Sequence, residues 1–82
     1  MFEVALSNQA SKFMRGADKV LAKRLIQKLE KLKKEPIGHD SKRIIGHDLF
    51  RVRVGNYRIL YAVRYEENKI VIEKIDHREK VY

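Results

Sequence analysis

The chain has 82 residues, with 19 Lys and Arg against 11 Asp and Glu, a formal net charge of +8 and no cysteine. This length accommodates one domain, residues 1–82, and the lack of cysteine excludes disulfides, thiolate metal sites and cysteine nucleophiles. The first residues lack the pattern of a signal peptide, and no apolar run approaches the ~20 residues of a membrane span. We therefore expect a cytoplasmic protein with no membrane partner.

The N-terminal half predicts a short strand, residues 2–6, followed by a helical hairpin. Ser7 is a suitable N-cap for the first helix, Gly16 a suitable end, and Asp18 a suitable N-cap for the second helix. The second helix ends before Pro36. Its apolar stripe, predicted to face the core, consists of Val20, Leu21, Leu25, Ile26, Leu29 and Leu32. We interpret most of its lysines as a solvated surface and not as a binding site.

A loop follows, in which the triplet Gly-His-Asp occurs twice, at residues 38–40 and 46–48. A metal site would need further ligands near His39 and His47, and nothing else clusters at metal-ligand spacing. We expect neither a metal nor a cofactor and interpret this pair as structural. His77 is a weak candidate for proton transfer.

Beyond the loop the hydrophobic period changes from 3.6 to 2, which predicts three consecutive strands. Residues 50–54 and 57–64 flank Gly55-Asn56, a two-residue hairpin turn of the glycine-first kind, and residues 69–75 follow a turn at 66–68. The order β-α-α-β-β-β predicts an α+β fold, with the helical hairpin packed on one face of a mostly antiparallel three-stranded meander.

The predicted turn places Arg53 directly opposite Arg58, with Arg51 on the same face of the hairpin. Like charges directly opposite each other cost up to about 1 kcal/mol. No acidic residue is interleaved with these three arginines on that face of the hairpin, and we interpret them as a site for an anion such as a phosphate diester. The alternative is an edge hairpin whose charges block aggregation.

The C-terminal segment adds two candidates, Arg78 and Tyr82. In one interpretation both fold back over the arginine-bearing face, where the tyrosine ring stacks on a base, an interaction worth about 1–3 kcal/mol. The other interpretation, ordinarily the safer one for a C-terminus, is a frayed tail.

These residues together resemble the RelE/ParE toxin superfamily and, within it, the RelE-like branch. The resemblance lies in a basic-x-basic strand, a turn, then Tyr-Arg-hydrophobic-hydrophobic-Tyr, and a terminal His-Arg-x-x-Val-Tyr, and it covers essentially the whole chain. It implies the toxin of a type II toxin–antitoxin system, a ribosome-dependent, metal-independent mRNA endonuclease acting in the ribosomal A site. It also implies a cognate RelB-like antitoxin, the ribosome and mRNA as partners, and no small-molecule cofactor.

The resemblance also implies catalytic roles. Arg51 and Arg53 stand at the basic pair, Arg58 at the arginine after the turn and Arg78 at the distal arginine. Tyr82 stands at the tyrosine that is linked to activating the 2′-hydroxyl, which attacks the adjacent phosphate.

The sequence departs from the family pattern in two ways. The basic pair is lysine in the best-known RelE toxins, and arginine effectively cannot give up its proton, so His77 or water must serve if a proton donor is needed. The usual extra C-terminal helix is also missing, which gives an antitoxin easier access. Two alternatives stay open: a ParE-like topoisomerase inhibitor that acts by binding, and a degenerate toxin that only binds its antitoxin or RNA.

Overall fold

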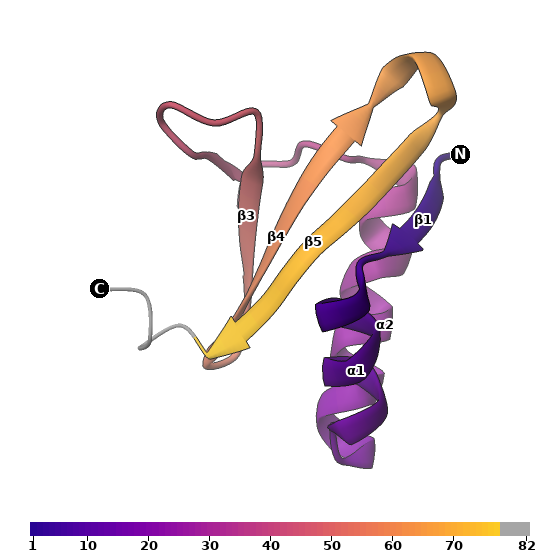
Figure 1. Ribbon diagram of the computed structural model, residues 1–82, viewed down its shortest axis with the longest axis vertical. Coiled ribbons are helices and arrows are strands. Elements are labelled where there is room, and N and C mark those ends of the chain that lie inside the picture. Colours follow the sequence, from indigo (N-terminus) through magenta and orange to yellow (C-terminus); the bar gives the residue numbers. More distant parts are fainter. Residues whose placement is uncertain (78–82) are drawn as a thin grey trace.

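The computed structural model describes residues 1–77, which form a five-stranded sheet with two helices on one face (Figure 1). The sheet order is β1-β5-β4-β3-β2, with β1 parallel to β5 and all other neighbours antiparallel. The elements are β1 (Glu3–Leu6), α1 (Asn8–Gly16), α2 (Lys19–Lys34), β2 (Lys42–Arg43), β3 (Phe50–Val54), β4 (Tyr57–Arg64), the 3-10 turn η1 (Tyr65–Glu67) and β5 (Lys69–His77). The predicted α+β fold is confirmed.

Both helices begin at the predicted caps. The Ser7 hydroxyl accepts the Ala10 backbone N–H at 3.1 Å, and the Asp18 carboxylate accepts the Leu21 N–H at 2.8 Å. Each cap satisfies an N–H group that the first helical turn leaves without a backbone partner. The α2 helix ends at Lys34, ahead of Pro36 as expected. Within residues 1–77 neither helix is long and apolar enough to cross a membrane.

The core lies between the helices and the sheet face that they cover. Leu25, Leu29 and Leu32 of α2 are buried there against strand residues such as Val52, Ile59 and Ile75. The prediction was wrong for Val20 and Ile26, which are 71% and 50% exposed. A helix that packs against one sheet face buries only one stripe, and the predicted stripe was wider than the contact.

The loop before β3 contains a short strand that the sequence did not predict. Lys42 and Arg43 pair with the start of β3 and form one edge of the sheet. Two charged residues show no hydrophobic alternation, so only tertiary pairing reveals this strand. Tyr61 anchors the preceding segment, because its buried hydroxyl donates to the Pro36 carbonyl at 2.6 Å and lies 2.8 Å from the Ser41 hydroxyl. Burial raises the pKa of Tyr61 above its ordinary value.

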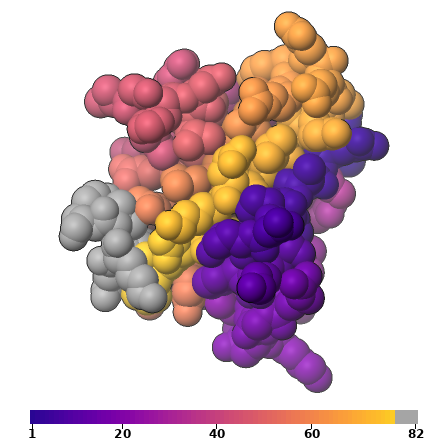
Figure 2. Space-filling model, in the orientation of Figure 1, coloured from indigo at the N-terminus to yellow at the C-terminus, as the bar shows by residue number. Residues whose placement is uncertain are grey.

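The longest strand, β5, lies between α1 and the β3–β4 hairpin on the face visible in Figure 2. Its pairing with β4 shifts between Leu60 and Tyr61, so Glu73 has no partner on β4. Beyond the end of β1, the side-chain amide of Gln9 replaces a strand partner, donating to the Ile75 carbonyl at 2.7 Å and accepting its N–H at 2.9 Å. β5 therefore continues to His77, two residues beyond the predicted end.

Candidate functional site

The β3–β4 turn has the predicted geometry. Gly55 adopts a φ of 59°, and Val54 pairs with Tyr57 across the turn. A positive φ favours glycine because it has no Cβ. The resulting register places Arg53 directly opposite Arg58, which confirms the predicted pairing of the two like charges.

Arg58 is the most unusual side chain of the hairpin. It is only 9% exposed, although it lies on the face of the sheet turned away from the helices, which we call the outer face. Its Nε–H has no hydrogen-bond partner within residues 1–77. A buried donor left without a partner costs about 1–3 kcal/mol, and more for a charged group. The site therefore contains a buried guanidinium with an unsatisfied N–H group, and an anionic ligand would supply the missing hydrogen-bond acceptor.

An acidic residue from outside the hairpin also lies on this face. Asp76 of β5 pairs with Arg58 on the side opposite Arg53. The hairpin pairing alone could not show this neighbour, because Asp76 comes from the third strand. One carboxylate reduces the local positive charge without cancelling it, since Asp76 also lies 3.6 Å from the Lys74 ammonium.

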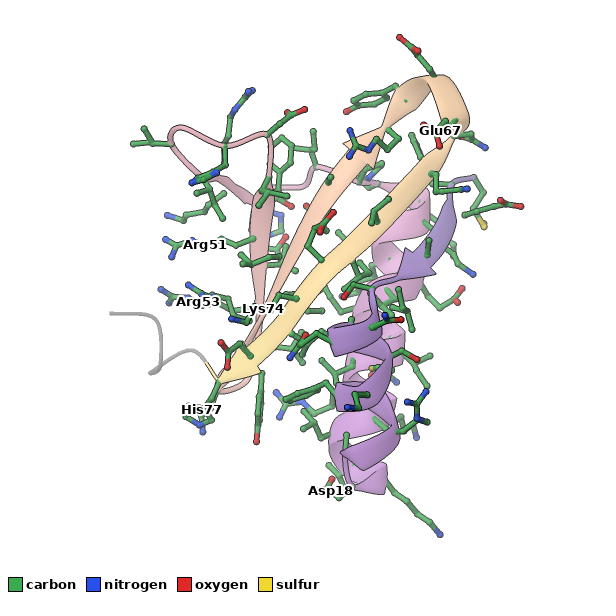
Figure 3. The ribbon with its side chains drawn as sticks, viewed as in Figure 1. Asp18, Arg51, Arg53, Glu67, Lys74 and His77 are labelled. Atoms are coloured by element: carbon green, nitrogen blue, oxygen red, sulfur yellow. The ribbon has the colours of Figure 1, made fainter. Side chains whose placement is uncertain are left out.

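A second row crosses the outer face next to the Arg53–Arg58 row. Figure 3 shows Arg51, Arg53 and Lys74 pointing away from the helices. Successive pairing across four strands gives this row the order Lys42, Arg51, Leu60 and Lys74. Leu60 thus forms an apolar floor with a cation on each side.

Sequence reasoning missed Lys74 and Asp76 for one physical reason. Strict alternation from Ile70 and Ile72 would point Lys74 toward the core. The unpaired Glu73 shifts the alternation by one residue, so that Ile75 is buried and its two neighbours face outward. The signal in the sequence is the three-residue spacing between Ile72 and Ile75, where two is expected.

Three candidates from the sequence remain, Arg78, Tyr82 and His77. Arg78 and Tyr82 lie outside the described residues. His77 pairs with Tyr57, and their rings meet edge-to-face at 5.1 Å on the helix side of the sheet. The imidazole is therefore turned away from Arg53 and Arg58, which share the opposite face.

The two Gly-His-Asp triplets form no metal centre within the part of the chain that the structure describes, which contains no cluster of three or more His, Cys, Asp or Glu able to hold a metal ion. Asp40 accepts a hydrogen bond from Lys28 of α2 at 2.6 Å, and this bond lowers the pKa of the carboxyl below its ordinary value. The second triplet contributes only a long contact, 3.9 Å between Asp48 and Arg43.

Positive charge continues around the hairpin turn to α2. A Cβ added at Gly55 would lie 2.9 Å from the nearest guanidinium nitrogen of Arg24, so this side chain covers the turn. A groove between α2 and the hairpin is lined by residues that include Arg24, Lys28, Lys31 and Arg53.

These features together form a site for an anion that carries several oxygens. Two opposed guanidiniums offer several N–H donors with fixed geometry, which suits a phosphate diester. The same donors stabilise charge that accumulates on phosphate oxygens during displacement. The arrangement suits phosphoryl chemistry by charge stabilisation.

The chain is similar to known proteins over nearly its whole length. Residues 4–82 match the family described as the ParE toxin of the type II toxin–antitoxin system parDE. The protein named RelE1 of Methanocaldococcus jannaschii is 33% identical, covering 99% of this chain and 94% of its own length.

Solved structures show the same fold. The RelE–RelB complex of Pyrococcus horikoshii OT3 contains a chain that is 26% identical, with a TM-score of 0.81 and 98% of both chains covered. The isolated RelE toxin of E. coli is 18% identical, with a TM-score of 0.83, covering 94% of this chain and 84% of its own. The chain belongs to the ParE toxin family of type II toxin–antitoxin systems, and within the RelE/ParE superfamily to its RelE-like branch.

Proposed function

We propose that this toxin is a ribosome-dependent mRNA endonuclease. The observation that carries the proposal is Arg58, a buried guanidinium opposite a second arginine, with an Nε–H that no residue of the described chain satisfies. A protein stabilised by its own contacts alone gains nothing from this arrangement, whereas a phosphate bound between Arg53 and Arg58 would satisfy both.

The proposed reaction is an attack of the RNA 2′-hydroxyl oxygen on the adjacent phosphorus. A 2′-O–P bond forms, the P–O5′ bond breaks, and the products carry a 2′,3′-cyclic phosphate and a 5′-hydroxyl. Arg51, Arg53, Arg58 and Arg78 bind the phosphate and stabilise its developing charge. Tyr82 accepts the 2′-hydroxyl proton or stacks on a base.

Dependence on the ribosome follows from what the site provides. The outer face supplies charge stabilisation, and the ribosome would hold single-stranded RNA in line for attack, because positioning contributes a large part of any rate enhancement. The ribosome would hold the mRNA in the cytoplasm, and the net charge of +8 would favour the approach to RNA.

The test is in-vitro cleavage of ribosome-bound mRNA by the purified protein. We expect wild-type cleavage and a loss of ~100-fold to ~1,000-fold in Arg58→Ala and in Tyr82→Phe, the range for losing a transition-state donor. Lys23→Ala, which removes an exposed lysine from α2, is the matched control and should cleave normally. Wild-type rates in both site variants would exclude the proposal.

We also propose a RelB-like antitoxin as the partner. Structures of related chains, including that of Pyrococcus horikoshii at 26% identity, contain RelE together with RelB, and the charge of +8 suits an acidic binding partner. Co-expression with the neighbouring small open reading frame, followed by affinity purification, should recover a stable complex. Recovery of the toxin alone would contradict this partner.

A second function is supported by the family match itself, which is to the ParE toxin. A ParE-like protein would inhibit a topoisomerase by binding and would need no catalytic arginines. Purified protein that blocks gyrase supercoiling while leaving mRNA intact would favour this function. We expect no effect on supercoiling.

A further inference from the structure

The proposed reaction needs a proton donor that the arginines cannot provide. When the P–O5′ bond breaks, the 5′ oxygen leaves with a negative charge, and a donor in reach lowers the barrier by protonating it. Arginine keeps its proton in proteins, so Arg51, Arg53 and Arg58 can stabilise charge but cannot serve as the acid. Water or another side chain close to the bound phosphate must do so.

Lys74 occupies a suitable position. It lies on β5 opposite Leu60, in the same row as Arg51, and two residue pairs from the Arg58–Asp76 pair on the same face. Figure 3 shows its side chain on the side of the sheet to which Arg51 and Arg53 point. The side chain is 51% exposed, so its ammonium is accessible to RNA bound over the arginines.

The Lys74 ammonium lies close to the carboxylate of Asp76. The separation of 3.6 Å from Lys74 Nζ to Asp76 Oδ2 exceeds that of a strong charge-assisted hydrogen bond. A contact of this length brings the ammonium near the carboxylate and leaves its N–H groups available to a second partner. Lysine carries three N–H donors, so one can contact Asp76 while another faces a leaving group.

The other described groups with a transferable proton are placed less well. His77 packs against Tyr57 on the helix side of the sheet. Lys42 lies on the edge strand β2, two strands from Arg58, whereas Lys74 lies on the strand next to Arg58. Lys69 pairs with Arg64 at the opposite end of β4.

We propose that Lys74 is the general acid of the cleavage reaction, an inference that rests on the proposed function. In the displacement, the 2′ oxygen bonds to phosphorus, the P–O5′ bond breaks, and a proton passes from Lys74 Nζ to the departing 5′ oxygen. The amine regains a proton from water after the products leave. Arg53 and Arg58 hold the phosphate while this transfer occurs.

The experiment compares two mRNAs in single-turnover cleavage on the ribosome, one with an ordinary linkage and one with sulfur replacing the 5′ oxygen at the cleaved bond. A thiolate leaves without protonation, so the sulfur substrate removes the need for an acid. We expect Lys74→Met to slow cleavage of the ordinary substrate ~100-fold or more and to cleave the sulfur substrate at the wild-type rate.

Two further variants separate proton donation from charge. Lys74→Arg keeps the positive charge and should behave like Lys74→Met, slow on oxygen and normal on sulfur. Lys69→Met removes another lysine of β5, at the opposite end of β4, and should cleave both substrates at nearly wild-type rates. Arg58→Ala should be slow on both, because phosphate binding does not depend on the leaving group.

The assignment is overturned if Lys74→Met slows both substrates equally or slows neither. It is also overturned if Lys74→Arg cleaves the ordinary substrate normally, because charge would then be sufficient. Wild-type protein that cleaves neither substrate would exclude the endonuclease function itself, and the assignment with it. Denaturation midpoints of all variants show whether each is folded at the assay temperature.

Discussion

The molecule has two basic surfaces, the lysine-rich surface of α2 and the arginines on the outer face of the β3–β4 hairpin. Two lysines of α2 have acidic partners, with Lys28 2.6 Å from Asp40 and Lys33 3.1 Å from Glu30. The remaining lysines of this helix include Lys23, which is exposed to solvent. The ammonium groups of these lysines are satisfied by acidic side chains or by water.

The hairpin surface is different. Arg58 is 9% exposed, lies opposite Arg53, and has an Nε–H without a partner in the described structure. A solvated charge and a buried, incompletely satisfied charge contribute equally to the net charge of +8. Only the second has a free-energy reason to bind an anion. The anion site is therefore identified by the burial and incomplete hydrogen bonding of an arginine, and not by the number of positive charges on a surface.

Charge reversal should give the largest difference in cleavage rate between the two surfaces. Arg53→Glu and Lys23→Glu each lower the net charge by two, so any long-range effect on approach to RNA is shared. At saturating ribosome concentration we expect Arg53→Glu to cleave ~100-fold more slowly and Lys23→Glu to stay within about twofold of wild type. Equal losses would mean that total charge, and not the site, sets the rate.

Removing the buried charge should stabilise the protein. In Arg58→Met a side chain of similar length fills the same space without an unsatisfied donor, and we expect the free energy of unfolding to rise by about 1–3 kcal/mol. Urea denaturation measures this change. A matched loss of charge on α2, Lys23→Met, should alter stability by less than about 0.5 kcal/mol. A marked loss of stability in Arg58→Met would show that the guanidinium is structural.

The loop that leads into β2 can be tested through Tyr61. Tyr61→Phe removes the hydroxyl that contacts Pro36 and Ser41, and we expect a loss of about 1–2 kcal/mol at neutral pH. Because the pKa of Tyr61 is raised above 10.0, the unfolded chain loses this proton first, and its contribution to stability declines as pH rises above about 10. Urea denaturation at about pH 8 and about pH 10.5 should show a shallower decline in the variant. Parallel declines would contradict the role of burial.

The smallest effect is expected at the Lys28–Asp40 pair of the α2 surface. The pKa of Asp40 is lowered, so its contribution to stability is present above the unfolded value near 3.8 and is lost as pH falls through the folded pKa. With 46% of the Asp40 side chain exposed, Asp40→Asn should cost less than about 1 kcal/mol at neutral pH. Thermal melts should show the difference shrinking at about pH 3 and at high salt. A difference that persists under both conditions would mean that the pair is not the cause.

The features predicted best from the sequence were the helix boundaries and the hairpin register, which depend on residues close together along the chain. Ser7, Asp18 and Pro36 set the helix boundaries, and the Gly55 turn set the Arg53–Arg58 register. Each is a local rule that acts within a few residues, and the arginine face followed from the register.

What the sequence could not predict depends on pairing between distant segments. The charged β2 strand exists only because β3 offers it an edge, and the carboxylate beside Arg58 comes from β5. The unpaired Glu73 reverses the alternation that would have located Lys74. Val20 was assigned to the core because periodicity shows which residues share a face but not how wide the covered stripe is.

The central claim is that the buried guanidinium of Arg58 serves the reacting phosphate and not the fold. The measurement that tests it most directly is the single-turnover rate of mRNA cleavage by Arg58→Met on saturating ribosomes, with its urea midpoint measured in parallel. We predict a rate at least ~100-fold below wild type in a protein that is more stable than wild type. A rate within about twofold of wild type would contradict the account.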